Sequence, residues 1–236
     1  MTSAEPQSIL VTGATGNVGR PLVDQLIATG HRVRALTRNP ATAGLPAAVE
    51  TVAGNLSDTA GLAKAFDGVT AAHLITFGDD YAPLTNGPDL VALAAAAGVK
   101  RVTVLKGDIT RSPLEEAVQA GDLRWTFLAP VEFMSNTLEW AHSVAAEGVV
   151  RDGFADGRSA MIHDGDIAAV AATVLTSAGH DGREYWLTGP EALTPPERVR
   201  IIADVLGRDV RFEELSRDEV VAQATGRDRR KLHRRP

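Results

Sequence analysis

The sequence contains no cysteine and few aromatic residues. Without cysteine, the chain forms no disulfide, no thiolate zinc site and no cysteine nucleophile. Phe, Trp and Tyr together make up 5% of the 236 residues, and only two of these residues are tyrosines, Tyr81 and Tyr185. Chemistry that depends on a phenol therefore has two candidate positions in the whole sequence.

Long apolar runs and a secretory leader are also missing. No apolar stretch is long enough to cross a bilayer, and residues 1–7 lack the charged start and apolar middle of a signal peptide. We therefore expect a cytoplasmic protein with no membrane partner. No metal site is expected either, because the histidines lack the spacing of metal ligands. They are His31, His73, His142, His163, His180 and His233.

Acidic residues outnumber basic ones, which gives a net charge of −6 and argues against a nucleic-acid partner. The exception is a basic cluster at residues 227–235, which we expect to be a solvated tail. The length is sufficient for a sizeable core and fits one domain over residues 1–236. We expect a monomer or a homodimer.

A glycine-rich turn follows the apolar residues 8–12 and precedes an amphipathic helical pattern. Gly13 permits a tight turn, and Gly16 lets backbone amides approach a pyrophosphate. Gly19 lets the helix pack closely on the sheet. The start of the helix presents free N–H groups and the positive end of its dipole to phosphates. This order of strand, glycines and helix predicts a dinucleotide site.

The end of the second expected strand, residues 31–40, indicates which dinucleotide binds. NAD sites usually place Asp or Glu there, to accept hydrogen bonds from the ribose hydroxyls. This sequence has Thr37 and Arg38 instead. A guanidinium suits a phosphate monoester, so the 2′-phosphate of NADP(H) is the better match. The alternative is that Arg38 is a solvated charge at a strand end.

Strand and helix patterns alternate along the chain, which predicts an α/β fold with a doubly wound parallel sheet. The expected strands are residues 8–12, 31–40, 49–53, 71–77, 101–106 and 125–128. After the helix that follows the glycines, the expected helices are residues 58–66, 87–97, 113–120, 134–146, 164–176 and 196–206. We expect residues 8–130 to form the dinucleotide-binding core and residues 131–236 a small substrate-binding region at the carboxyl ends of the strands.

Several segments resemble the NmrA-like branch of the atypical short-chain dehydrogenases/reductases. They are VTGATGNVG at 11–19, VRALTRNP at 33–40, GNLSD at 54–58, AGVKRV at 97–102 and LTGP at 187–190. The resemblance extends from about residue 8 to about residue 215. It implies a Rossmann domain that prefers NADP(H), in a family of reductases and redox-sensing regulators. Arg38 matches the arginine of that branch for the 2′-phosphate, and Asn55 replaces an aspartate usual near the adenine.

The expected site residues come from these motifs and from the strand ends. Cofactor contacts are expected from Gly13, Thr15, Gly16, Asn17, Val18, Gly19, Arg38, Asn55, Leu56, Thr76 and Lys106. A mostly apolar substrate pocket is expected from Phe77, Pro130, Val131, Phe133 and Met134.

The sequence departs from active short-chain reductases at the catalytic positions. Those enzymes generally use a tyrosine with a lysine four residues later, and the lysine lowers the pKa of the phenol. Here Thr85 follows Tyr81 at that spacing and Gly189 follows Tyr185. The serine expected at the end of the fifth strand is also missing, and Lys106 is found there.

Two functions remain open from the sequence. The first is an NADPH-dependent ketoreductase for an aromatic or polyketide-like small molecule, with the ketone or the alcohol as substrate. Its proton would come from a hydroxyl of the substrate, from water or from Lys106, which could instead pair with Asp108 as a surface charge. The second function is a redox sensor that binds NADP(H) without turnover and acts through a protein partner.

Overall fold

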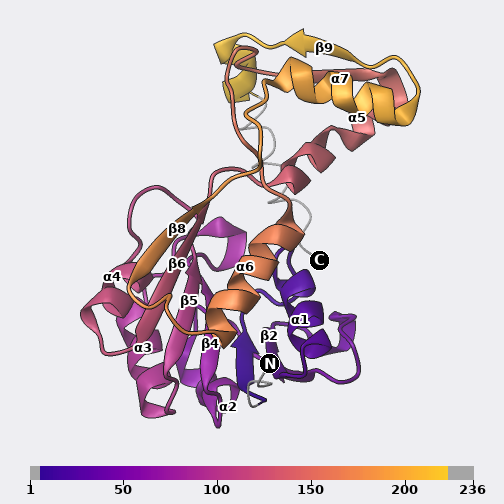
Figure 1. Ribbon diagram of the computed structural model, residues 1–236. Coiled ribbons are helices and arrows are strands. Elements are labelled where there is room, and N and C mark those ends of the chain that lie inside the picture. The colour runs from indigo at the N-terminus through magenta and orange to yellow at the C-terminus, as the bar shows by residue number, and fades with distance from the viewer. Residues whose placement is uncertain (1–5, 223–236) are drawn as a thin grey trace. The chain divides into compact units, whose positions relative to one another are not determined.

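The computed structural model describes residues 6–222, and its main element is a seven-stranded parallel sheet (Figure 1). The strand order is β3-β2-β1-β4-β5-β6-β8, and every neighbouring pair is parallel. The strands are β1 (Ser8–Val11), β2 (Arg32–Thr37), β3 (Glu50–Ala53), β4 (Ala71–Ile75), β5 (Arg101–Leu105), β6 (Arg124–Pro130) and β8 (Arg183–Leu187). This is the predicted doubly wound fold. The basic cluster 227–235 lies outside the described residues.

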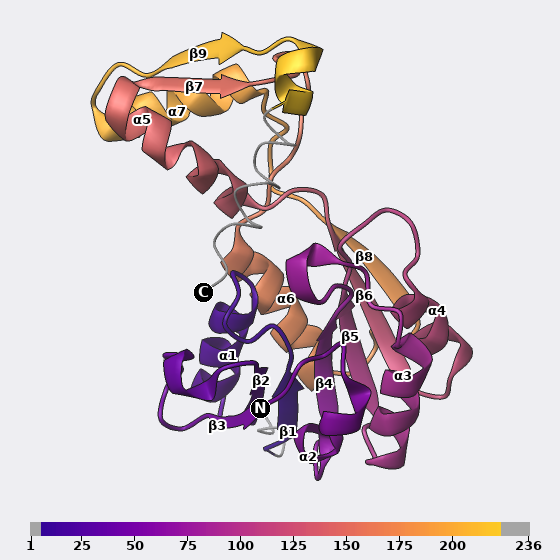
Figure 2. The same cartoon turned by 180° about the vertical axis from the view of Figure 1, so that it is seen from behind.

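Helices cover both faces of this sheet (Figures 1 and 2). On one face α1 packs beside α6, and on the other α3 packs beside α4, with α2 next to α3. The helices are α1 (Gly19–Ala28), α2 (Ala63–Phe66), α3 (Gly87–Ala96), α4 (Pro113–Ala120) and α6 (Asp164–Thr176). The core beneath α2, α3 and α4 is apolar and includes Leu10, Leu74, Val104 and Phe127, all fully buried.

The chain divides into two compact units. Of the described residues, 6–131 and 162–187 form the first unit, and 132–161 and 188–222 form the second. The described part of the second unit contains α5 (Ala141–Glu147), α7 (Pro195–Leu206) and a parallel pair of strands, β7 (Val149–Asp152) and β9 (Arg211–Glu214). Arg198 joins Glu132 there through two hydrogen bonds of 2.8 and 2.9 Å. The expected division into residues 8–130 and 131–236 departs from these units in one respect, the return of residues 162–187 to the first unit.

Other expected elements differ in detail. Residues 58–66 were expected as one helix, but the 3₁₀ turn η2 (Thr59–Gly61) precedes α2, because Gly61 weakens the helix. Residues 134–146 likewise begin as the 3₁₀ helix η4 (Met134–Trp140) before α5. β8 was not predicted from the sequence, because this edge strand is half exposed and lacks the apolar run of a buried parallel strand.

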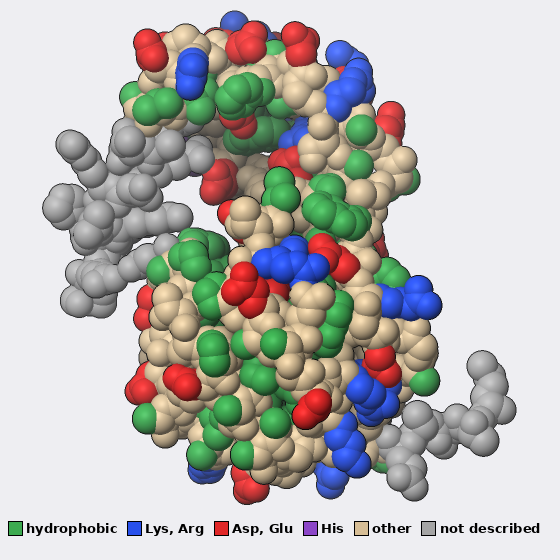
Figure 3. Space-filling model, turned by 90° about the vertical axis from the view of Figure 1, so that its left-hand side faces the viewer, with side chains coloured by type: hydrophobic (Ala, Val, Ile, Leu, Met, Phe, Trp, Pro, Cys, Tyr) green, Lys and Arg blue, Asp and Glu red, His purple; other side chains and the backbone are tan. Residues whose placement is uncertain are grey.

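Charged side chains of both signs are interspersed on the face of the molecule in Figure 3. Among residues 6–222, no helix is both long enough and apolar enough to span a bilayer. Within the same residues, no group of three or more His, Cys, Asp or Glu side chains is placed to hold a metal ion.

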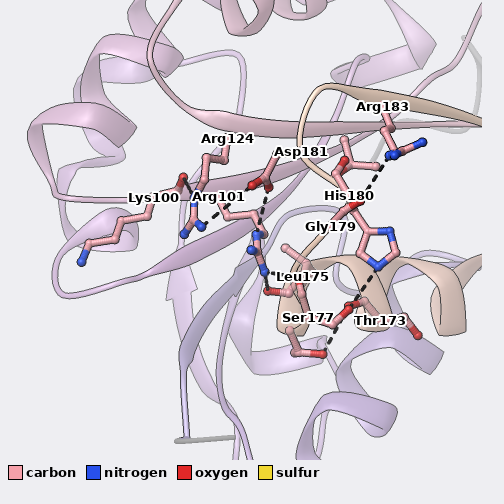
Figure 4. Close-up of polar contacts among 12 residues, drawn as sticks. Lys100, Arg101, Arg124, Thr173, Leu175, Ser177, Gly179, His180, Asp181 and Arg183 are labelled. Atoms are coloured by element: carbon pink, nitrogen blue, oxygen red, sulfur yellow. Dashed lines mark hydrogen bonds and ion pairs between the residues drawn. The ribbon is translucent and has the colours of Figure 1, made fainter.

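Arg101 holds the returning segment 162–187 at the amino-terminal end of β5 (Figure 4). Its buried guanidinium donates hydrogen bonds to the carbonyl oxygens of Leu175 and Ser177 at the end of α6. The same guanidinium lies 3.5 Å from the carboxylate of Asp181, just before β8. A cation at a helix C-terminus satisfies orphan carbonyl groups and the negative end of the dipole. Arg101 therefore anchors both α6 and β8.

A second buried charge, Lys106, joins the carboxyl end of β5 to α4. Its ammonium lies 2.7 Å from Glu115 and 3.4 Å from Glu184, and the Lys106 and Glu115 side chains are 4% and 1% exposed. Glu115 also completes a capping box with Ser112 at the start of α4. The Lys106 ammonium therefore pairs with Glu115 and Glu184, whereas the Asp108 carboxylate accepts hydrogen bonds from Thr110, which lower its pKa.

A row of buried polar side chains crosses the sheet on the face opposite the apolar core. His73, Thr103 and Thr126 are in register on β4, β5 and β6. The imidazole Nδ1 of His73 lies 2.7 Å from Thr103 Oγ1. Burial lowers the pKa of His73 from 6.5 to about 4.

This shift makes stability depend on pH. The unfolded chain binds a proton at His73 below pH 6.5, whereas the folded chain binds one only near pH 4, so stability falls as the pH falls through that window. Between pH 7 and pH 5 we expect a loss of about 2 kcal/mol, measured by urea denaturation. The variant His73→Gln should lose most of this dependence. His31→Gln should lose little, because that imidazole is half-buried, and equal losses in both variants would contradict the assignment.

The pair of Lys106 and Glu115 generates a prediction about stability. Glu115→Gln keeps the capping box but removes the charge opposite the buried ammonium, so we expect about 3–5 kcal/mol of destabilisation. The matched control is Glu197→Gln, which makes the same change in the corresponding capping box with Thr194 at the start of α7, where the carboxylate pairs with the exposed Arg158. The control should change stability little. Lys106→Met added to Glu115→Gln should restore much of the loss in urea denaturation, and no restoration would contradict the charge argument.

Candidate cofactor site

The turn between β1 and α1 has a backbone that requires glycine. Gly13 has a φ of +61°, in the left-handed region, and its carbonyl oxygen accepts a hydrogen bond of 2.9 Å from the Gly16 amide. A β-carbon at Gly19 would lie 2.1 Å from that same oxygen. The first turn of α1 therefore lies so close to the loop that only glycine fits at position 19.

This turn places the start of α1 between β1 and β4, where the strand order of the sheet reverses. Open α/β sheets bind ligands at this reversal, beyond the carboxyl ends of the strands. The first turn of α1 contains no acidic residue that would neutralise its positive dipole end. Arg20 in that turn donates hydrogen bonds to the carbonyl oxygens of Ala43 and Gly44 and so positions the loop after β2. These features fit an anionic diphosphate.

A cavity of about 310 Å³ lies beyond the ends of β1, β2, β3 and β4. Five expected cofactor residues line it, namely Gly13, Thr15, Arg38, Asn55 and Leu56. Phe77, which we expected in the substrate pocket, lines the same cavity. The other lining residues are Leu36, Thr37, Asn39, Thr42, Ala43, Gly54, Ile75, Gly78 and Asp79.

The other expected residues of the glycine turn lie beside this cavity without lining it. Gly16 and Asn17 are exposed on the turn, while Val18 and Gly19 are buried where α1 begins. Thr76 is buried after β4, and its hydroxyl accepts a hydrogen bond from the Gly107 amide. Thr76 thereby joins the ends of β4 and β5.

Arg38, Asp79 and Asn55 form a polar network at one side of the cavity. The guanidinium of Arg38 makes an ion pair with one carboxylate oxygen of Asp79. The other carboxylate oxygen accepts a hydrogen bond of 2.8 Å from the Asn55 side-chain amide. The Arg38 side chain remains 70% exposed, so a ligand in the cavity can reach it.

Lys106 was expected at the cofactor and as a catalytic residue. Its ammonium is directed at Glu115 and Glu184, and Lys106 is not among the residues that line the cavity. These contacts favour a structural role for Lys106. A catalytic role for it stays a prediction.

The expected substrate-pocket residues belong to different parts of the chain. Phe77, Pro130 and Val131 lie in the first unit, where the latter two end β6 and follow it. Phe133 and Met134 lie in the second unit, at the start of η4. A single pocket formed by these residues stays a prediction.

Neither tyrosine has a lysine at the catalytic spacing, and their surroundings differ. Tyr81 lies on the loop after β4, is 72% exposed and packs its ring 5.4 Å from that of Phe77. The hydroxyl of Tyr185, on β8, lies 2.9 Å from the imidazole of His180.

Asp79 and the loop residues after β2 line the cavity but were not predicted from the sequence. The topology could have placed them there, because the loops after neighbouring parallel strands meet at the same edge of the sheet. Asp79 comes four residues after the end of β4 and two residues after Phe77, which was expected in the substrate pocket. What the sequence lacked was any indication that this carboxylate faces Arg38.

Comparison with known proteins places this site in a family. Residues 5–104 match the profile of the NmrA-like family. The (4-alkanoyl-5-oxo-2,5-dihydrofuran-3-yl)methyl phosphate reductase of Streptomyces griseus is 41% identical over 223 residues, which cover 89% of this chain and 78% of that protein. The NAD(P)H azoreductase of Xenophilus azovorans is 32% identical over 238 residues, covering 92% and 80%.

A solved structure agrees with these relatives. The NADPH-dependent quinone oxidoreductase of Escherichia coli superimposes with a TM-score of 0.77 at 27% identity, covering 92% of this chain and 81% of that one. The resemblance seen in the sequence motifs and the predicted Rossmann fold are thereby confirmed. This chain belongs to the NmrA-like family.

Proposed function

We propose that this chain is an NADP-dependent oxidoreductase that reduces a conjugated carbonyl group of an aromatic or polyketide-like small molecule. The observation that carries the proposal is Arg38 at a cavity built on the glycine turn. Support comes from the relatives, whose names describe reductases of a furanone phosphate, of azo compounds and of quinones. The furanone, the azo compounds and the quinones in these names all contain conjugated double bonds.

The chain offers candidate contacts for the diphosphate, the 2′-phosphate and the adenosine of NADP(H). The glycine turn and the start of α1 would hold the diphosphate, and Arg38 would hold the 2′-phosphate. Asn55 and Leu56 line the cavity near Arg38 and would contact the adenosine. When bound, NADPH supplies the hydride. The protein's part is to orient the cofactor and the acceptor and to exclude competing reactions.

The proton must come from a different source than in reductases with a tyrosine and lysine pair. Lys106 is held by two carboxylates, and Tyr185 is bound to His180. A quinone relieves this requirement because hydride transfer leaves a phenolate, and an enone does so where hydride adds to its β-carbon and leaves an enolate; hydride addition to the carbonyl carbon of an aromatic ketone leaves an alkoxide, which needs a proton donor beside it. Water or an adjacent hydroxyl of the substrate then provides the proton.

Turnover tests this function directly. We expect the protein to oxidise NADPH in the presence of quinones and hydroxylated aromatic ketones, followed by the loss of NADPH absorbance. Binding of NADPH without turnover across such a panel would favour the redox sensor that acts through a protein partner.

Cofactor preference should depend on Arg38. We expect NADP(H) to bind at least about tenfold more tightly than NAD(H), because the guanidinium contacts the 2′-phosphate, and Arg38→Ala to remove most of this difference. Titration calorimetry measures both constants. The matched control is Arg32→Ala, an exposed arginine at the other end of β2, which should keep the preference. Equal constants for the two cofactors in the unaltered protein would contradict the prediction.

The two tyrosines should be dispensable for the chemistry. Removal of a general acid typically lowers kcat by about 10²–10⁴-fold, so Tyr81→Phe and Tyr185→Phe should each keep more than about a tenth of kcat. Methylation of the substrate hydroxyl beside the carbonyl should instead slow turnover by about 10²-fold or more. A thousandfold loss of kcat in Tyr81→Phe, with NADPH binding intact, would show that a tyrosine is the acid.

A further inference from the structure

We infer that Asp79 sets the strength of NADP(H) binding by competing with the 2′-phosphate for Arg38. This inference rests on the proposed function, because it concerns the same cofactor. It adds a carboxylate that controls the specificity of the site. The starting observation is that the guanidinium offered to the phosphate is already paired with an anion from another loop.

The loop after β4 holds Asp79 in place. The Gly78 amide donates a hydrogen bond of 2.8 Å to the Ala82 carbonyl oxygen, and the Leu84 amide donates one of 3.0 Å to Thr76. The loop also packs closely on the segment after β3, since a β-carbon at Gly78 would lie 2.2 Å from Ser57 Oγ. This close approach brings Asp79 within reach of both Asn55 and Arg38.

Electrostatics make Asp79 and a 2′-phosphate competitors. The guanidinium of Arg38 is one cation, and the phosphate would bring a second anionic group to it beside the carboxylate. The side chains of Arg38 and Asp79 are 70% and 45% exposed, so their ion pair is weak enough for a ligand to exchange. NADP(H) must therefore displace Asp79 or bind beside a like charge. NAD(H) carries no 2′-phosphate and escapes this competition.

Asn55 is coupled to the same exchange. Its side-chain amide donates to Asp79, and its side-chain carbonyl accepts from the Ser57 amide at 3.0 Å. The Asp79 carboxylate therefore links Arg38 to Asn55, and displacement of that carboxylate by a phosphate would leave the Asn55 side chain still anchored to Ser57. Binding of the phosphate to Arg38 would therefore change the contacts of Asp79 and Asn55 as well.

The experiment is a double-mutant cycle read by titration calorimetry with NADP⁺ and NAD⁺. Asp79→Asn keeps the shape and the hydrogen bond with Asn55 but removes the charge. We expect it to tighten NADP⁺ binding about fivefold and to leave NAD⁺ binding within about twofold. In the Arg38→Ala background the same substitution should no longer affect NADP⁺, because the contested cation is gone.

Asp89→Asn serves as the matched control. It removes the same charge from an exposed position in the first turn of α3, outside the cavity, and should leave both constants unchanged. A thermal melt of each variant shows that the fold is retained.

The outcomes separate this inference from the proposed function. Unchanged or weaker NADP⁺ binding in Asp79→Asn, in a protein that binds NADP⁺ and reduces a carbonyl substrate, would overturn the role of Asp79 alone. Tighter binding of both cofactors, or tighter binding that persists without Arg38, would also overturn it. An unaltered protein that binds neither cofactor would contradict the proposed function itself.

Discussion

The turn from β1 into α1 leaves no space for a side chain between the carbonyl oxygen of Gly13 and the α-carbon of Gly19, where a β-carbon would come within 2.1 Å. Because α1 starts this close to the sheet, its amino-terminal N–H groups lie at the point where the strand order reverses. The loops after β2, β3 and β4 then complete a cavity around that helix end. The contact between Gly13 and Gly19 fixes where the diphosphate of a cofactor would lie. Arg38 and Asn55 can contact the rest of that cofactor only because the diphosphate is held there.

Two ion pairs near the carboxyl edge of the sheet differ in burial, and burial decides what each one does. The pair of Lys106 and Glu115 is almost fully buried, and separation of such a pair costs about 3–5 kcal/mol. It therefore fixes α4 to β5. The pair of Arg38 and Asp79 is largely exposed, and pairs of that kind contribute at most about 1 kcal/mol. A phosphate ligand can replace the carboxylate at that small cost.

The sequence predicted those features that depend on local backbone and on periodicity. The glycine turn, α1, α3, α4 and α6 follow from residues close together in the chain, and so does the placement of Arg38 at the end of β2. The partners of Lys106 and Arg38 did not follow, because Glu115, Glu184 and Asp79 reach them across the fold. β8 was missed because its sequence resembles an exposed strand, and it pairs with β6 after a chain segment that Arg101 contacts at the end of α6 and at Asp181.

The absence of a tyrosine and lysine pair restricts the acceptors that such a site can reduce. Hydride addition to an isolated ketone produces an alkoxide, a base too strong to form unless an acid protonates it as it develops. Hydride transfer to a quinone produces a phenolate, and hydride addition to the β-carbon of an enone produces an enolate; in both anions the charge is delocalised, so that protonation by water can follow later. Lys106, at the end of β5, adds to this restriction, because its ammonium is already engaged in a buried ion pair with Glu115. The chemistry at this site therefore depends more on the electronic structure of the acceptor than on an acid supplied by the protein.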